Sequence, residues 1–440
     1  MSDSLTALDH RHLWHPFTQQ GDWCDENAIV IEHAEGSELV DADGRRYLDG
    51  VSSLWCNVHG HRHPRIDAAL REQIDRVAHS TLLGLTHPGA VELAARLVDI
   101  SPPGLSRVFY SESGSTAVEI ALKMAFQYWQ QHGGTEDRRR TSYVCLTDGY
   151  HGDTLGSVSV GGIDLFHGTY GPLLFDTHRV NPGDSEQLEC LLDVHAGEIA
   201  AVIVEPLVQG AAGIRVQPPG FLRRVSELCR EHDVFLIADE VATGFGRTGT
   251  MFACEQERVA PDFLCLGKGL TGGYLPLAAT LATERIYEGF LGEHADYRTF
   301  FHGHTFTGNP LGCAAALASL EVFRTEDTID RLQPKIRVLA ELLAGVAVMP
   351  GVAEIRSRGF MVGIDLGKHD PALRLGHRVT DAARERGAII RPLGDTIVLM
   401  PPLSISEADL RRLVGITAES IRVAVASANP ATEAELRAAA

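Results

Sequence analysis

The sequence predicts an α/β protein with a large, mostly parallel sheet and a smaller α+β part. From about residue 66 to residue 330, short apolar runs alternate with stretches of helical periodicity. Continuous apolar runs are typical of strands covered on both faces, and their alternation with helices favours right-handed crossovers between parallel strands. After about residue 330 the order changes to a helix, two strand regions and a closing helix. We therefore expect a large domain over 66–330 and a small domain that combines 1–65 with 331–440.

The individual elements follow in chain order. A hairpin of residues 37–41 and 45–49 turns at Asp43-Gly44, a favoured pair for tight turns. Strands of the large sheet are expected at 107–110, 143–146, 200–205, 234–239 and 263–266, with a helix at 116–131 after the first of them. In the small domain, strands near 353–365 and 388–400 precede a helix that begins at about residue 406.

Composition and charge exclude several classes of protein. Of the 440 residues, 44% are hydrophobic and 22% are charged, as in ordinary globular proteins. The net charge of −19 disfavours nucleic-acid binding, because phosphate backbones attract clustered positive charge. Residues 1–12 lack the apolar region of a signal peptide, and no apolar run approaches the roughly 20 residues that span a bilayer. The eight cysteines form no CxxC pair and fit reduced thiols, so we expect a cytoplasmic protein with no membrane or nucleic-acid partner.

One lysine of the chain has the surroundings of a catalytic group. The lysines are Lys123, Lys268, Lys335 and Lys368. Lys268 follows the apolar strand at 263–266 and lies between Gly267 and Gly269, which let the backbone approach a ligand closely. Open α/β sheets bind ligands at the carboxyl ends of their strands. Lys268 is therefore a candidate catalytic residue, whereas the other three fit a solvated surface.

A carboxylate and two loops lie at the ends of other strands. Asp239 follows the apolar run 235–238, and a buried acid needs a partner: a protonated pyridine nitrogen would serve, and so would an arginine in a structural ion pair. Ser113-Gly114-Ser115 starts the expected helix, where free amide groups attract phosphate, although ordinary capping turns look the same. Tyr150, after the next strand, could stack on a planar ring or lie on the surface.

Two further patterns are expected to carry no chemistry. Residues 244–249 match GxGxxG, but no obvious amphipathic helix follows them, so we expect no NAD site. Histidines cluster at 59–63 and 302–304 without acidic or cysteine residues at ligand spacing, so we expect no metal.

Three segments carry a resemblance to a known family. They are LIADEVATGFGRTG at 236–249, LGKGLTGGYLP around Lys268 and HGHTFTGNPL at 302–311. Together they resemble the class III (ω-amino) aminotransferases, and the likeness extends over nearly the whole chain. It implies the fold type I of transferases that depend on pyridoxal phosphate (PLP), with PLP as cofactor. It also implies a homodimer with active sites at the subunit interface, in which Thr305 would reach the phosphate bound by the neighbouring subunit.

The same resemblance assigns roles around the cofactor. It implies that Lys268 is bonded to PLP and that Asp239 binds the pyridine nitrogen. Gly114 and Ser115 would bind the phosphate group. Tyr150 would stack on the ring, and it joins Lys268 and Asp239 as the expected catalytic residues.

Further segments resemble the branch of this family that aminates 7-keto-8-aminopelargonate, a step of biotin synthesis. They are LWHPFT at 13–18, SLW at 53–55, GYHGD at 149–153 and RP at 391–392. This likeness implies that Arg391 holds the carboxylate of the keto substrate, a task that suits the guanidinium fork. It also places Asp153, Arg247 and Gly303 near the substrate.

Departures from the family pattern bear on the amino donor. Members that use S-adenosylmethionine usually carry tyrosine where this chain has Phe17, and two tryptophans where it has Leu54-Trp55. The segments PFTQ, AHSTLLG and RPLGD look more like a lysine-using branch. We therefore hypothesise that L-lysine is the donor, with S-adenosylmethionine as the alternative. Another ω-amino acid or diamine aminotransferase, an aminomutase and a PLP-sensing regulator are the rival functions.

Overall fold

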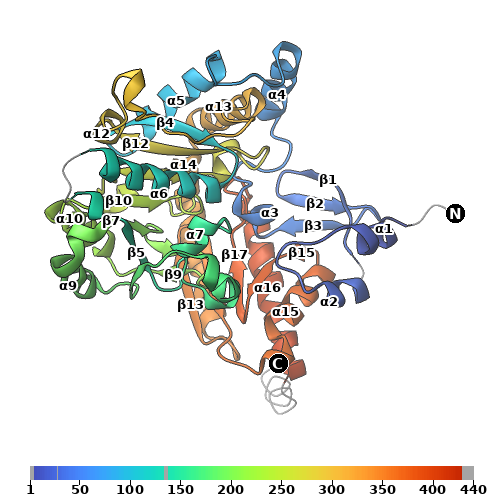
Figure 1. Ribbon diagram of the computed structural model, residues 1–440. Helices are drawn as coiled ribbons and strands as arrows, with labels where there is room; N and C mark the ends of the chain where they lie inside the picture. The colour runs from blue at the N-terminus through green and yellow to red at the C-terminus, as the bar shows by residue number, and fades with distance from the viewer. Residues whose placement is uncertain (1–3, 27, 133–136, 429–440) are drawn as a thin grey trace.

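The structure, a computed structural model, describes residues 4–26, 28–132 and 137–428 (Figure 1). Its centre is a seven-stranded sheet of order β4-β12-β11-β10-β7-β5-β6. These strands are β4 (Leu105–Ser111), β5 (Ser142–Leu146), β6 (His178–Val180), β7 (Ile199–Val204), β10 (Phe235–Asp239), β11 (Phe263–Leu266) and β12 (Ala278–Thr283). All neighbours pair in parallel except β12, which is antiparallel to β4 and β11. The mostly parallel α/β sheet is thus confirmed.

Strand β12 was not predicted from the sequence. Its residues read Ala-Ala-Thr-Leu-Ala-Thr, a run with few of the branched and aromatic side chains that mark strands. Tertiary contacts override this weak local preference, because every residue of β12 up to Ala282 is buried between its two neighbours.

Helices cover both faces of the sheet, and the strand side chains alternate between them. Phe235 and Ile237 of β10 belong to one apolar cluster, together with buried residues of α6 (Gly114–Gln131). Leu236 and Ala238 belong to a second cluster, which includes α5 (Pro88–Ile100) and α10 (Phe221–Glu231). Because successive side chains of a strand point to opposite faces, both faces need apolar residues, and the strands read as continuous apolar runs.

The N-terminal and C-terminal segments share a second, four-stranded sheet. Its strands are β1 (Ile31–Glu35), β2 (Glu38–Asp41), β3 (Arg46–Asp49) and β15 (Ala388–Ile389). The predicted hairpin is the antiparallel pair β2–β3, and β15 joins β3 in parallel (right side of Figure 1). This pairing agrees with a small domain built from both chain ends, although the proposed domain boundaries themselves stay a prediction.

The rest of the C-terminal part is an antiparallel sheet with three long helices. The strands are β13 (Glu354–Arg358), β14 (Met361–Asp365), β17 (Thr396–Leu399) and β16 (Arg391–Leu393), and the helices are α14 (Thr328–Ala347), α15 (Leu375–Glu385) and α16 (Glu407–Ala428). The remaining main helices are α1 (Leu5–His12), α2 (Gln20–Asp25), α3 (Ser52–Trp55), α4 (Pro64–Arg76), α7 (Leu155–Ser159), α8 (Asp164–His167), α9 (Ser185–His195), α11 (Cys254–Glu257), α12 (Glu284–Glu288) and α13 (Pro310–Thr325). Two short strands, β8 (Val208–Gln209) and β9 (Arg215–Val216), pair with each other.

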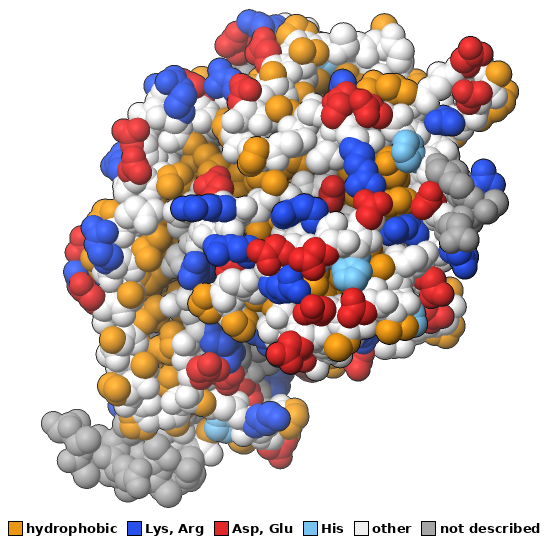
Figure 2. All heavy atoms as spheres, turned by 90° about the vertical axis from the view of Figure 1, so that its left-hand side faces the viewer, with side chains coloured by type: hydrophobic (Ala, Val, Ile, Leu, Met, Phe, Trp, Pro, Cys, Tyr) orange, Lys and Arg blue, Asp and Glu red, His pale blue; other side chains and the backbone are white. Residues whose placement is uncertain are grey.

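The surface on the side of α9, α10 and α12 carries charges of both signs. Figure 2 shows acidic and basic side chains intermixed on this face. Ion pairs on these elements include Arg107–Glu284 at 2.6 Å and Arg285–Asp233 at 2.8 Å. This face therefore lacks the single-sign basic stripe that attracts nucleic acid. Within the described residues, no helix is both long and apolar enough to cross a membrane.

Candidate active site

Five strands of the large sheet deliver polar residues to one edge. Their carboxyl ends lead to the loops that carry Ser113–Ser115, Tyr150, Glu205, Asp239 and Lys268. These loops enclose a cavity of about 490 Å³. It is lined by Trp55, Ser113, Gly114, Ser115, Tyr150, His151, Gly152, Asp153, Thr154, Glu205, Asp239, Val241, Ala242 and Lys268. The edge is the usual ligand site of open α/β sheets.

Lys268 lies half-buried in this cavity, on a 3₁₀ turn that follows β11. Its φ of 41° is a left-handed conformation that costs free energy for a side chain with a Cβ. The Nζ atom lies 5.2 Å from the ring centroid of Trp55. Burial lowers the pKa of the Lys268 ammonium, and the negative charges of Asp239 and Glu205 offset only part of this effect. The side chain is thus biased toward the neutral amine that acts as a nucleophile or base.

Asp239 is 5% exposed, and its carboxylate is held from two sides. The Nδ1 atom of His151 lies 2.7 Å from Oδ2, and the amide of Val241 donates to Oδ1 at 3.1 Å. Burial alone would lower the pKa of His151, but the hydrogen bond and charge of Asp239, with a contribution from Glu205, raise it. These two contacts fix the position of the Asp239 carboxylate at the cavity wall.

Glu205, directly after β7, is a second buried acid at the same edge. It is 6% exposed, and it accepts hydrogen bonds from the amides of Tyr150 at 3.1 Å and Gly210 at 2.8 Å. Burial raises its pKa to about 7. Neither Glu205 nor His151 was predicted to have a role in the site. Glu205 carried the same signal as Asp239, an acid at the end of an apolar run, and His151 lay within the GYHGD segment.

The start of α6 offers a cradle for an anion. Ser113 caps this 18-residue helix, and its hydroxyl accepts the amide hydrogen bond of Thr116 at 3.3 Å. A Cβ on Gly114 would come within 2.4 Å of the Cγ1 atom of Val241, so only glycine fits there. Ser115 approaches Gly152 so closely that a Cβ at 152 would lie 2.3 Å from the Ser115 hydroxyl. Free amides and small side chains at a helix N-terminus form a typical phosphate site.

Tyr150, Asp153 and Arg391 form a polar group at the outer side of the cavity. The hydroxyl of Tyr150 donates to Oδ2 of Asp153 at 2.7 Å. Burial and this hydrogen bond raise the pKa of Tyr150, while the positive charge of Arg391 acts against them. Burial lowers the pKa of Arg391, and no described residue forms an ion pair with it. The guanidinium is therefore available to an anionic ligand.

Arg247 has a different environment from Arg391. It is 1% exposed and donates to the backbone carbonyls of Asn57, Met400 and Pro401, at 3.1, 3.3 and 2.6 Å. Burial lowers its pKa to about 10. In this structure its guanidinium holds segments of the chain together, and its expected place near the substrate stays a prediction.

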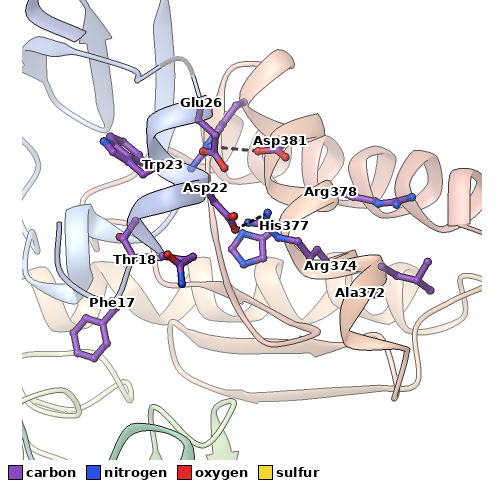
Figure 3. Close-up of a pocket in the computed structure, with 13 residues that line it drawn as sticks. Phe17, Thr18, Asp22, Trp23, Glu26, Ala372, Arg374, His377, Arg378 and Asp381 are labelled. Carbon is purple, nitrogen blue, oxygen red and sulfur yellow. Dashed lines mark hydrogen bonds and ion pairs between the residues drawn. The ribbon is translucent and has the colours of Figure 1, made fainter. Parts of the chain in front are cut away.

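Of the other expected substrate residues, only Trp55 and Asp153 line the cavity. Phe17 and Leu54 are exposed by 58% and 45%, and Phe17 points away from the residues of α15 (Figure 3). Gly303 and Thr305 lie exposed in the loop before α13, outside the cavity of their own chain. The expected role of Thr305 needs a neighbouring subunit, and the roles of both residues stay predictions.

A second cavity, of about 590 Å³, lies between α2 and α15 (Figure 3). Its lining mixes cations with acids, and Arg374 and Asp22 form an ion pair across it at 3.1 Å. It contains none of the polar residues of the sheet edge. The residues predicted to be catalytic therefore line the smaller cavity, around Lys268.

The weak motifs of the sequence take structural roles. Residues 244–249 form turns after β10, and the helix that follows, α11, has four residues, which is too short for a dinucleotide-binding crossover. His59 is buried and lies 3.0 Å from the Ser319 hydroxyl. Among the described residues, no group of three or more potential ligands could hold a metal ion.

Comparisons with known proteins agree with this geometry. A family model described as aminotransferase class III matches residues 21–421. The adenosylmethionine-8-amino-7-oxononanoate aminotransferase of Nitratidesulfovibrio vulgaris is 59% identical, over 93% of this chain and 80% of that protein. The crystal structure of the Methanocaldococcus jannaschii enzyme of the same name is similar with a TM-score of 0.93 and 45% identity, over 95% of this chain and 98% of that one.

A further solved structure is an amine transaminase from an uncultivated Pseudomonas species in its PLP-bound form. It has a TM-score of 0.86 and 36% identity, over 95% of this chain and 99% of that one. The family match spans most of the sequence, and the structural neighbours are PLP-dependent transaminases of fold type I. The chain belongs to the class III aminotransferases.

Proposed function

We propose that this aminotransferase converts 7-keto-8-aminopelargonate (8-amino-7-oxononanoate) to 7,8-diaminopelargonate in biotin synthesis, with PLP as cofactor. The observation that carries the proposal is the set of titratable side chains around the cavity, the half-buried Lys268 with the buried Asp239 and His151. Beside them, Arg391 forms no ion pair with a described residue. The names of the relatives at 44–59% identity support the acceptor.

The residues present fit PLP. A phosphate group suits the cradle at Gly114 and Ser115, where a Cβ added at Gly114 or at Gly152 would clash with Val241 or Ser115. Asp239 would bind a protonated pyridine nitrogen, Tyr150 would stack on the ring, and Lys268 would bind the cofactor covalently. When bound, PLP supplies an electron sink next to the reacting carbon.

The side chains of the site would then have separate roles in the reaction. Burial lowers the pKa of Lys268 and so favours the amine form of Nζ. This amine would move a proton away from the donor carbon next to nitrogen in one half of the cycle, and onto the former keto carbon of the acceptor in the other half. His151 and the Val241 amide hold the Asp239 carboxylate in one orientation, so it need not reorganise as charge develops. Arg391 would bind the acceptor carboxylate with a bidentate fork, and Asp153 fixes the Tyr150 hydroxyl.

The amino donor is L-lysine or S-adenosylmethionine. The names of the relatives favour S-adenosylmethionine. Phe17 and Leu54 favour lysine, because they leave the pocket without the hydroxyl and the indole of the family members that use S-adenosylmethionine. We keep lysine as the hypothesis for the donor, and both donors belong in the test.

We also infer a cytoplasmic homodimer. Thr305 is exposed and does not line the cavity of its own chain, as expected of a residue that reaches the site of a second copy. Exposed apolar side chains in neighbouring loops, such as Phe301 at 73% and Phe306 at 57%, would be covered in such a dimer.

The experiment that tests the function is product formation from defined substrates. Purified holoenzyme receives 7-keto-8-aminopelargonate with either L-lysine or S-adenosylmethionine, the donor nitrogen being labelled with ¹⁵N. Mass spectrometry should detect labelled 7,8-diaminopelargonate with one of them. Absence of the diamine with both donors would assign the chain to another class III activity.

A further inference from the structure

The turn that carries Trp55 to the cavity, at residues 52–55, has a strained backbone. Ser52, Ser53 and Trp55 have φ angles of 51°, 61° and 65°, which side chains with a Cβ rarely adopt. At Ser53 the ψ angle is −47°, so its backbone comes close to the γ-turn of positive φ, a rare and strained conformation. Strain of this kind persists only where the surrounding structure holds it. The turn therefore depends on contacts from outside it.

A buried carboxylate at the end of β3 supplies the first of these contacts. Asp49 is 1% exposed, and its Oδ1 atom accepts a hydrogen bond from the Ser53 amide at 2.8 Å. Its Oδ2 atom accepts one from the Ser53 hydroxyl at 3.0 Å and lies 2.9 Å from Nε2 of His61. A buried carboxylate needs such partners. His61 thus fixes Asp49 from one side, and Asp49 holds the most strained residue of the turn on the other.

Further contacts anchor the chain before and after Trp55. The buried Ser52 donates its hydroxyl hydrogen to the Met400 carbonyl at 2.6 Å. The Arg247 guanidinium donates to the same carbonyl at 3.3 Å and to the carbonyl of Asn57 at 3.1 Å. The turn is therefore attached to the C-terminal part of the chain, and Asp49 is the acid that holds its centre.

The turn places the Trp55 ring against the residue predicted to react. The ring is buried, and its centroid lies 5.2 Å from Nζ of Lys268. On another side, a Cβ on Gly210 would come within 3.0 Å of the ring, so the ring has no room to move that way. A displacement of about 1 Å in a catalytic site can cost about 100-fold in rate. The position of the turn therefore bears on the reaction at Lys268.

We propose that Asp49 is a positioning residue. With His61 it holds the strained turn at 52–55, and so keeps the Trp55 ring beside Lys268, where the ring bounds the space for the reacting part of the substrate. The inference rests on the proposed function, because the ring position matters to catalysis only if the reaction takes place at Lys268. Asp49 itself contacts neither substrate nor cofactor, and it acts through Trp55.

The test follows the Trp55 ring directly in the holoenzyme. The chain has four tryptophans, so protein labelled with 5-fluorotryptophan gives few ¹⁹F NMR signals, and Trp55→Phe identifies the one of Trp55. Asp49→Asn keeps the shape of the side chain but replaces one acceptor oxygen with a donor. It should shift or broaden the Trp55 signal and leave that of Trp129, which packs against Phe235 of β10. The kcat/KM for the keto acceptor should fall about 10- to 100-fold.

Asp41→Asn is the matched control in the same small sheet. Asp41 is also buried, at the end of β2, and accepts hydrogen bonds from the Tyr47 hydroxyl at 2.8 Å and the Arg45 amide at 2.8 Å. It holds its own hairpin and has no contact with the turn at 52–55. The control should lower stability as Asp49→Asn does, yet leave the Trp55 signal and kcat/KM unchanged.

Variants of His61 give a second, milder test. His61→Ala removes the contact on Oδ2 and should shift the Trp55 signal in the same direction as Asp49→Asn. His61→Gln keeps an N–H donor and should restore most of the signal position and of kcat/KM. If Asp49→Asn does not fold, the His61 pair decides the question, and a Trp55 signal that His61→Ala leaves in place contradicts the proposal.

The proposal is also contradicted if Asp49→Asn leaves the Trp55 signal and kcat/KM unchanged, or if Asp41→Asn changes both as much. Failure of the proposed function has a different signature. In that case the unaltered enzyme makes no 7,8-diaminopelargonate with either donor, while the ¹⁹F signals still report whether Asp49 holds the Trp55 ring.

Discussion

The inner and the outer sides of the site are built on different principles. At the sheet edge, Asp239, Glu205 and His151 are each at most 6% exposed, and hydrogen bonds within the chain hold them. The outer side starts from the arm, where α1 and α2 bury no residue and Phe17 is 58% exposed. A single chain thus fixes the groups proposed for the chemistry, whereas the surfaces proposed for substrate selection need a ligand or a second chain to cover them.

The largest expected effect comes from the inner side. Lys268→Ala removes the amine that moves the proton, and kcat should fall by about 1000-fold or more. PLP should still bind noncovalently, since the cradle at Gly114 and Ser115 is unchanged. Steady-state turnover together with the absorbance of the bound cofactor measures both. Lys368→Ala, at an exposed lysine, is the control; turnover retained in Lys268→Ala would refute the assignment.

Asp239→Asn tests whether the buried Asp239–His151 pair takes part in catalysis or only stabilises the fold. The amide cannot stabilise a protonated ring nitrogen as a carboxylate does, so kcat should fall about 100- to 1000-fold. Because the Asp239 charge raises the pKa of His151, the variant should also lower that pKa, which NMR of the cofactor-free protein can follow. An unchanged rate would make the pair structural.

Arg391→Ala tests the outer side of the site, where the carboxylate of the keto acceptor is proposed to bind. Loss of a charged hydrogen-bonding partner should raise the KM of the keto acceptor about 10- to 100-fold. The donor half-reaction should change far less, and single-turnover kinetics with each substrate separates the two. Equal effects on both halves would count against a carboxylate-binding role.

The smallest expected effect is on stability, through Glu205. Its pKa of about 7 in the folded protein exceeds the ordinary glutamate value of 4.5, so the folded state binds more protons than the unfolded state between these two pH values. Stability should therefore fall as pH rises from about 4.5 to about 7 and level off above. Glu205→Gln should remove this fall, amounting to about 1–3 kcal/mol. Urea unfolding of the cofactor-free protein between pH 4.5 and 7 measures this change in the free energy of unfolding. If the free energy of unfolding of Glu205→Gln changes with pH as much as that of the unaltered protein, the raised pKa of Glu205 is contradicted.

The sequence allowed prediction of the sheet and the inner site for one physical reason. Lys268 and Asp239 follow apolar runs, and the carboxyl ends of parallel strands meet at one edge. Glu205 gave the same signal and was missed. The hydrogen bonds of Asp49 could not be predicted, because they depend on the strained backbone of the turn at 52–55. The contacts of the Arg247 guanidinium with backbone carbonyls could not be predicted from a motif either. The carbonyls belong to Asn57 and Pro401, which lie far from Arg247 in the sequence.

The most direct test of the account is the position of the covalent cofactor. Holoenzyme is reduced with borohydride, digested and mapped by mass spectrometry. The account predicts that the added mass of the cofactor lies on the peptide with Lys268, and that Asp239→Asn keeps it there. Added mass on Lys123, Lys335 or Lys368, or on no lysine, would contradict the claim that the sheet-edge cavity is the catalytic site.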